Sequence, residues 1–203
     1  MTGVQTCALP ISLQGDFERH LYQLTALGVS GREVRLTKDL TGLDGLIIQG
    51  GESTTMNNLI DRFSLRQELS SFVKHKAVWG TCAGMIMLAT KIIDSMIEPL
   101  GAIDITVTRN GYGRQVHSFF TDLNLTLDNK NVIIPASFIR APLVNKTGSA
   151  VAVLAKYDNH PILLSQGNCL VSSFHTELHS DKTLLKYFID KFVLLAQVSQ
   201  QTN

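Results

Sequence analysis

The feature that most constrains this chain is a cysteine that stands between two glycines, in the run Gly-Thr-Cys-Ala-Gly at residues 80–84. A short apolar run precedes it at 77–79, and a helix-compatible apolar run follows it at 85–88. Glycines at both flanking positions let a strand turn sharply into a helix, because side chains there would collide with the neighbouring strand and helix. The pattern predicts a strand–turn–helix elbow that holds Cys82 in a strained backbone conformation.

Such an elbow suits Cys82 to nucleophilic chemistry. The helix that follows would direct its free N–H groups and the positive end of its dipole at the sulfur, which favours the thiolate. The N–H of Ala83 would then be placed to stabilise an oxyanion. The alternative is a buried structural cysteine, and the five residues by themselves do not separate the two.

Composition indicates a globular protein that works away from nucleic acids and membranes. The chain has 203 residues, 44% of them hydrophobic, which suggests one domain with a full core. Its net charge is +1 without a basic block, and no apolar run has the length of a membrane span. The three cysteines are too few and too scattered for a disulfide framework or a zinc site, so we expect a reducing, cytoplasmic location.

Strand and helix patterns alternate in the first half of the chain and predict a parallel sheet with helices on both faces. The expected elements are a helix at 16–27, a short strand at 33–36, a buried strand at 43–49, and helices through 56–60 and at 65–73. The apolar face of the first helix is expected to comprise Phe17, Leu21, Leu24 and Leu27.

The second half is richer in strand. We expect strands at 103–108, 119–127, 132–138 and 150–157, a hairpin at 162–173 that turns at 166–168, and a closing helix at 184–193. Residues 197–203 are expected to form a frayed tail.

Residues 1–12 fit a first strand poorly. Their alternation is weak, and Pro10 would interrupt the hydrogen bonds of a central strand. Residues 2–11 resemble the conceptual translation of a common sequencing adapter, so we expect that they replace a natural first strand; the alternative is an ordinary, poorly patterned strand. The folded unit is then expected to span residues 13–196.

A histidine and a glutamate follow the hairpin strand, in the run at residues 174–179. A histidine that activates a thiol needs a third group to orient its ring, and Glu177 can share a face with His175 in an extended or turn conformation. The alternative is a metal pair of His175 and His179 at helical spacing. That pair lacks an evident third ligand, and Asp181, at the start of the next helix, argues against a helix here.

Three further positions could hold a ligand. Gly51 follows a buried strand at the end where ligands bind in open α/β sheets, although an ordinary turn with Ser53 as the helix N-cap is the alternative. Arg109 and Arg140 each follow a strand-like run and could bind a carboxylate with two hydrogen bonds; the alternative for each is a surface ion pair.

Seven runs of residues occur together in one order, at 13–17, 50–55, 80–84, 109–110, 113–116, 138–142 and 173–178. Together they resemble the glutaminase subunits of pyridoxal 5′-phosphate synthase, which are class I glutamine amidotransferases. The cysteine elbow is shared by that whole class, whereas the runs at 50–55, 109–116 and 138–142 are more specific. The resemblance covers the chain from Leu13 to about Phe192.

The resemblance implies a role for each matching residue. Cys82 attacks the side-chain amide carbon of glutamine, His175 moves the proton, and Glu177 orients His175. The N–H groups of Gly51 and Ala83 form the oxyanion hole. Gln14 lies near this hole and the subunit interface. The glutamine-contacting positions are Gly51, Glu52, Ser53, Arg109, Ile139 and Arg140.

The resemblance also implies the fold and the partner. The expected fold is a single three-layer α/β domain, with a mostly parallel central sheet, helices on both faces and an added antiparallel hairpin region. Water hydrolyses the glutamyl thioester, and ammonia passes to a separate synthase protein, which is a (β/α)₈ barrel that makes pyridoxal 5′-phosphate. The chain itself is expected to need no cofactor and no metal.

Some residues depart from the family pattern. Gln49 and Thr176 stand where proline is usual, and His117 replaces a more usual acidic residue. The N-terminal run, which in the family would be a central first strand, is the largest departure and predicts lower stability or a disturbed partner interface. Other hypotheses remain open: a non-catalytic regulatory subunit of the same synthase, an amidotransferase subunit of another pathway such as imidazole glycerol phosphate synthesis, and, least supported, a cysteine peptidase.

Overall fold

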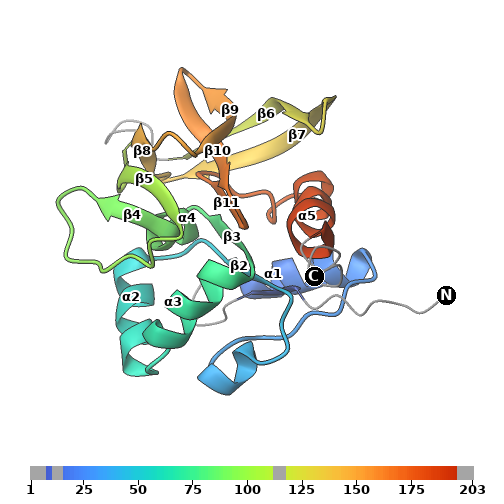
Figure 1. Ribbon diagram of the computed structural model, residues 1–203. Coiled ribbons are helices and arrows are strands. Elements are labelled where there is room, and N and C mark those ends of the chain that lie inside the picture. Colours follow the sequence, from blue (N-terminus) through green and yellow to red (C-terminus); the bar gives the residue numbers. More distant parts are fainter. Residues whose placement is uncertain (1–7, 11–15, 112–117, 196–203) are drawn as a thin grey trace.

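A computed structural model describes residues 8–10, 16–111 and 118–195 of the chain (Figure 1). Its main sheet has six strands in the order β1 (Ala8–Pro10), β2 (Gly45–Ile48), β3 (Ala77–Thr81), β11 (Cys169–Ser172), β10 (His160–Gln166) and β9 (Ala152–Tyr157). The pairs from β1 to β11 are parallel, and β10 and β9 add antiparallel strands. This confirms the mostly parallel sheet and the predicted hairpin.

Helices cover both faces of this sheet. α2 (Ser53–Arg62), α3 (Arg66–His75) and α4 (Ala83–Leu88) pack on one face, while α1 (Phe17–Ala26) and α5 (Thr183–Phe188) pack on the other (Figure 1). Successive residues of β2 alternate between the two cores, because side chains along a strand point to opposite faces. Ile48 belongs to the first core and Ile47 to the second.

Two smaller sheets extend the second half of the chain. β4 (Ala89–Ile92), β5 (Ile103–Thr108) and β8 (Leu143–Thr147) form one, and the long hairpin of β6 (Ser118–Leu127) and β7 (Lys130–Ile139) forms the other. β4 and β8 were not predicted. β4 continues the apolar run directly after α4 and its burial does not alternate, so its sequence carries no strand period.

Three expectations about secondary structure are corrected. The strand predicted at 33–36 is reduced to an isolated bridge at Val34, followed by a 3₁₀ turn at Thr37–Leu40. The closing helix is α5 followed by a π-helical segment, Ile189–Leu194. Within the described residues β1 stands at the end of the strand order and not inside it, and Pro10 pairs with Ile47 there.

The buried face of α1 also differs from the prediction. Leu24 is buried as expected, but Phe17, Leu21 and Leu27 are only half-buried. The other two fully enclosed side chains of the helix are polar, those of His20 and Gln23. The buried face of α1 is therefore partly polar, and His20 and Gln23 on it face residues far away in the sequence.

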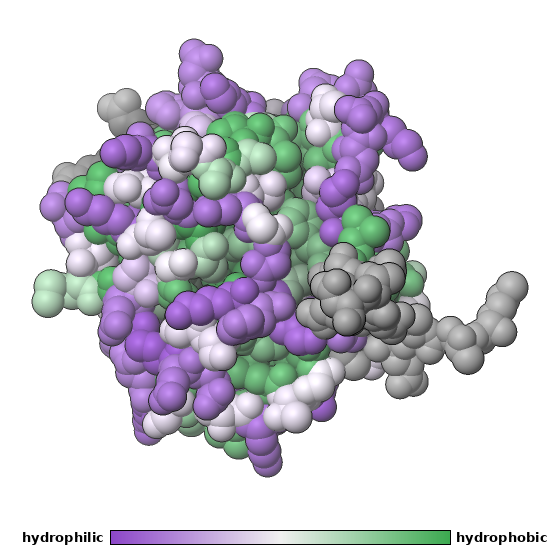
Figure 2. All heavy atoms as spheres, in the orientation of Figure 1, coloured by the Kyte–Doolittle hydropathy of each residue, from purple (hydrophilic) through white to green (hydrophobic). Residues whose placement is uncertain are grey.

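The surface mixes polar and apolar side chains. On the face shown in Figure 2, hydrophilic and hydrophobic side chains are interspersed. No helix in the described ranges is both long and apolar enough to span a membrane. The predicted tail at 197–203 and most of the unusual segment at 1–12 lie outside the described residues.

Candidate active site

The predicted elbow is present between β3 and α4. Cys82 has φ 49° and ψ −104°, a conformation that is strained for a residue with a side chain. A Cβ at Gly80 would lie 2.5 Å from the carbonyl carbon of Gly84, and a Cβ at Gly84 would lie 1.8 Å from the carbonyl oxygen of Ile48. The N–H of Cys82 donates to the carbonyl of Ser172 at 2.8 Å, which fixes the turn.

His175 and Glu177 meet Cys82 at this turn. His175 Nδ1 lies 2.6 Å from Glu177 Oε1, and the same ring shares a side-chain hydrogen bond with Cys82. The backbone of His175 exchanges two hydrogen bonds with Ser137 of β7, at 2.9 and 3.0 Å. Gly50 leaves room for the ring, since a Cβ there would lie 2.1 Å from the imidazole Cε1.

Burial and hydrogen bonding shift the pKa values of His175 and Glu177. Burial disfavours the charged ring of His175, but its hydrogen bonds with Cys82 and Glu177 outweigh that cost and raise its pKa to about 10. Burial likewise opposes ionisation of Glu177, yet the positive charge that the facing His20 carries when protonated and the hydrogen bond from His175 lower its pKa to about 2. The carboxylate therefore stays ionised and the His175 ring favours the protonated form that a thiolate needs beside it.

A cavity of about 250 Å³ opens over Cys82. All the predicted site residues that the structure describes line it: Gly51, Glu52, Ser53, Cys82, Ala83, Arg109, Ile139, Arg140, His175 and Glu177. The sequence therefore identified residues that the fold brings together from five separate segments. Gln14 and the run at 113–116 lie outside the described residues.

One wall of the cavity is organised by Glu52. Its carboxylate accepts hydrogen bonds from the N–H groups of Thr54 and Thr55, at 3.0 and 2.7 Å, and so caps α2. The N-cap is therefore Glu52, and not Ser53 as the alternative of an ordinary turn had it. Its Oε1 also accepts from Arg109 Nη2 at 2.8 Å. Partial burial opposes ionisation of Glu52, but its hydrogen bonds with Thr54 and Thr55 outweigh that effect and lower its pKa to about 2.

The opposite wall comes from the end of β7. Arg140 has φ 45°, so the chain turns sharply after Ile139, whose carbonyl oxygen lies 3.7 Å from Cys82 Sγ. The N–H of Gly111 donates to the carbonyl of Ala141 at 3.1 Å and joins this turn to the loop that follows Arg109. Backbone and arginine groups from both loops thus face the nucleophile.

The metal-pair alternative is not supported by the geometry. The segment 175–179 is not helical, so His175 and His179 do not have helical spacing. His179 Nε2 instead lies 2.8 Å from Ser137 Oγ, where it helps to hold the loop against β7. Among the residues that the structure describes, no group of three metal-binding side chains occurs.

Sequence reasoning missed two residues that face this group from α1, His20 and Gln23. Their i, i+3 spacing beside Leu24 was the available signal, because it places two polar side chains on the buried face of a short helix.

The model of the SNO glutamine amidotransferase family matches residues 10–194. The chain belongs to the SNO glutamine amidotransferase family.

Relatives in this family are similar over nearly their whole length. A pyridoxal 5′-phosphate synthase subunit PdxT from Francisella philomiragia is 43% identical over 180 residues, covering 89% of this chain and 96% of the relative. A protein of the same name from Fervidobacterium nodosum is 47% identical over 178 residues, covering 87% and 92%.

Solved structures agree on the fold. A crystal structure of a glutamine amidotransferase matches with a TM-score of 0.84 and 40% identity, covering 90% of this chain and 97% of that one. The structure of PurLQS from Thermotoga maritima matches with a TM-score of 0.67 at 16% identity, covering 98% of this chain and 100% of that one, and shares the fold. The class I glutamine amidotransferase-like α/β fold expected from the sequence is confirmed.

Proposed function

We propose that this chain is the glutaminase subunit of a pyridoxal 5′-phosphate synthase. It hydrolyses L-glutamine to L-glutamate and ammonia, and the ammonia goes to a synthase subunit. The observation that carries the proposal is the Cys82–His175–Glu177 group at the base of the Glu52–Arg109 cavity. The names and lengths of the relatives support the assignment to this synthase.

The first half of the reaction forms a thioester. Cys82 Sγ attacks the side-chain amide carbon of glutamine, and the carbonyl π electrons move to oxygen, where the N–H groups of Ala83 and Gly51 stabilise the charge. His175 holds the proton taken from the thiol and delivers it to the amide nitrogen. The C–N bond then breaks, ammonia leaves, and the glutamyl group remains on sulfur.

The second half releases glutamate. A water molecule attacks the thioester carbon while His175 accepts its proton, and collapse of the tetrahedral intermediate breaks the S–C bond. The returning thiolate is stabilised by the protonated ring of His175. Glu177 keeps Nδ1 of that ring as a donor through both halves, so that the other ring nitrogen faces the sulfur and the substrate.

The polar walls of the cavity suit the amino-acid end of the substrate. We assign the α-carboxylate of glutamine to Arg109, which Glu52 holds in place at 2.8 Å, and to the turn at Arg140. Ser53 and Ile139 complete the same site. Arginine is suited to this task because its planar fork matches a carboxylate.

The partner and the limits of the domain are part of the proposal. We propose that the synthase subunit is a (β/α)₈ barrel, that residues 13–196 are the glutaminase domain, and that the chain works in the cytoplasm. Gln14 is assigned to the neighbourhood of the oxyanion hole and the partner interface. We also propose that residues 1–12 replace a natural first strand.

The test is glutamate release from glutamine by the chain alone and with a synthase subunit, beside a Cys82→Ala variant. Release that the partner stimulates and the variant loses supports the proposal. A Cys169→Ala variant is the matched control, because that thiol is fully buried in β11 and does not line the cavity. If a folded complex releases no glutamate, the chain is a regulatory subunit. If only the synthase of another pathway stimulates release, the chain is an amidotransferase subunit of that pathway.

A further inference from the structure

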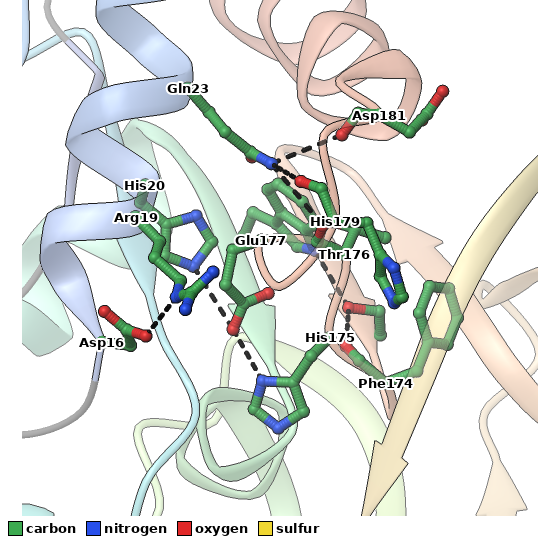
Figure 3. Close-up of polar contacts among 12 residues, drawn as sticks. Asp16, Arg19, His20, Gln23, Phe174, His175, Thr176, Glu177, His179 and Asp181 are labelled. Carbon is green, nitrogen blue, oxygen red and sulfur yellow. Dashed lines mark hydrogen bonds and ion pairs between the residues drawn. The ribbon is translucent and has the colours of Figure 1, made fainter. Parts of the chain in front are cut away.

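Helix α1 turns a polar buried face toward the loop that carries Glu177 (Figure 3). His20 and Gln23 lie on this face, at 0% and 2% exposure. Polar side chains are rarely enclosed so completely unless they make specific contacts. Both point toward the loop after β11, more than 150 residues away in the sequence.

His20 faces the carboxylate of Glu177. Its Nε2 lies 3.8 Å from Glu177 Oε1, which is longer than a hydrogen bond, and within the described residues neither ring nitrogen of His20 has another hydrogen-bond partner. The same oxygen of Glu177 accepts the hydrogen bond from His175 Nδ1 at 2.6 Å. The carboxylate is thus the polar group that the buried imidazole of His20 faces. The carboxylate lies between two imidazole rings, one from the catalytic loop and one from α1. Trp79 supports the His20 ring edge-on, with ring centroids 6.0 Å apart.

Gln23 holds the backbone of the same loop. Its side-chain Nε2 donates toward the carbonyl oxygens of His179 at 3.0 Å, Asp181 at 3.3 Å and Thr176 at 3.5 Å. One amide group therefore contacts three backbone carbonyls of the turn that contains Glu177. The carbonyl of Thr176 also accepts from the N–H of His179, so removing the amide would chiefly leave the carbonyls of His179 and Asp181 short of a donor and free the loop to shift.

We propose that α1 is a positioning element of the catalytic group, in which His20 fixes the orientation of the Glu177 carboxylate and Gln23 fixes the loop that carries it. The inference rests on the proposed glutaminase function and adds to it two positioning residues outside the Cys–His–Glu group.

The charge state of His20 suits this role. Burial lowers the pKa of His20, and the nearby His175 lowers it further, whereas Glu177 and Asp16 oppose the shift. The ring is therefore neutral near pH 7 and can offer an N–H without adding a second positive charge beside His175. A carboxylate that rotated away would leave His175 without the partner that fixes its tautomer.

The test uses a matched pair of substitutions, His20→Gln and His20→Met. The two side chains have similar length, but only glutamine retains an N–H donor. Packing favours methionine in this enclosed site, so a purely structural role predicts that His20→Met keeps the higher melting temperature and the higher kcat. The positioning role predicts that His20→Gln has the higher kcat even if His20→Met has the higher melting temperature. Activity would then follow the N–H donor and not the stability of the fold.

The measurements are kcat and KM for glutamate release with the synthase subunit present. We expect His20→Met to lower kcat between about tenfold and a hundredfold with KM within about twofold, and His20→Gln to recover part of the loss. Gln23→Met should also lower kcat. Thr25→Ala is the control on the same helix, because Thr25 is exposed and its hydroxyl donates to the carbonyl of Leu21 within α1.

A second measurement needs neither glutamine nor the synthase. The rate at which iodoacetamide alkylates Cys82 at pH 7, read by mass spectrometry of the Cys82 peptide, reports its thiolate content. We expect a lower rate in His20→Met than in wild type. The inference would be overturned if folded His20→Met and folded Gln23→Met both kept the wild-type kcat and the wild-type rate of Cys82 alkylation. If His20→Met does not fold, the result for Gln23→Met decides. If the wild-type chain itself releases no glutamate in the presence of the synthase subunit, the proposed function is overturned instead.

Discussion

Gly84 lies directly against the backbone of Ile48, at the point where α4 crosses the end of β2. A Cβ on Gly84 would stand 1.8 Å from the Ile48 carbonyl oxygen and 2.7 Å from its carbonyl carbon. Both atoms belong to the backbone of an internal strand, so no side-chain rotation relieves the contact. The closeness of helix and strand is what places Cys82 at the base of the cavity.

Gly84→Ala is therefore expected to destabilise the protein by about 3 kcal/mol or more, because overpacking against a fixed backbone forces the strand or the helix to move. Gly28→Ala is the control: its added Cβ meets open space, and the cost, about 1 kcal/mol, comes only from its φ of +71°. Denaturant unfolding of both variants measures the difference. Equal losses of stability would contradict the close approach.

Glu177→Gln tests the orienting carboxylate. An amide in place of the carboxylate can present an N–H to His175 and favour the wrong tautomer, so we expect kcat to fall by about 10²- to 10⁴-fold. Complex formation with the synthase subunit should persist, since Glu177 is buried and its replacement has the same shape. Steady-state kinetics of the complex measure the effect, and a change confined to KM would be inconsistent with an orienting role.

The pKa of His20 predicts a loss of stability at mildly acidic pH. Burial lowers that pKa from its ordinary value of 6.5 in the folded protein. As the pH falls below 6.5, the unfolded chain binds a proton at this position and the folded chain does not, so the free energy of unfolding decreases. The melting temperatures of wild type and His20→Gln, measured from pH 7 to pH 5, should converge or cross, because only the wild type loses stability through this histidine. Parallel curves would show that His20 takes up its proton equally in both states.

Glu52 combines two tasks that can be separated. Glu52→Ala removes the N-cap of α2 and the partner of Arg109, so it should cost about 1 kcal/mol of stability and also raise KM for glutamine. Arg109→Ala leaves the cap in place and should raise KM with little change in stability. Chemical denaturation and glutamine titration of the two variants provide the comparison; a stability loss as large in Arg109→Ala would argue against the cap.

The catalytic group could be predicted from the sequence because local rules place each of its parts. Gly80 and Gly84 predict the elbow at the end of β3. The hairpin that turns at 166–168 pairs β11 with β3 and so brings His175 close to that elbow. The polar walls were predicted from the family resemblance, since the residues around Arg109 and Arg140 by themselves left a surface ion pair open as the alternative.

The part that could not be predicted depends on contacts across the whole chain. The apolar period of residues 16–27 favours Phe17 and Leu21 as the core face, yet His20 and Gln23 are the more deeply buried. Their partners, Glu177 and the carbonyls after it, are brought near only when the sheet is complete. Hydrophobic periodicity indicates which face of a single helix is apolar, and it contains no information about contacts with residues far away in the sequence.

Trp79 gives the protein a built-in optical reporter. It is the only tryptophan in the chain, it is fully buried, and its indole lies against His20 while its N–H points to Ser172 Oγ at 3.3 Å. Its fluorescence therefore arises within the packing that supports Glu177. Changes in this packing, protonation of His20 among them, are therefore expected to change the emission of Trp79, in real time and without a label.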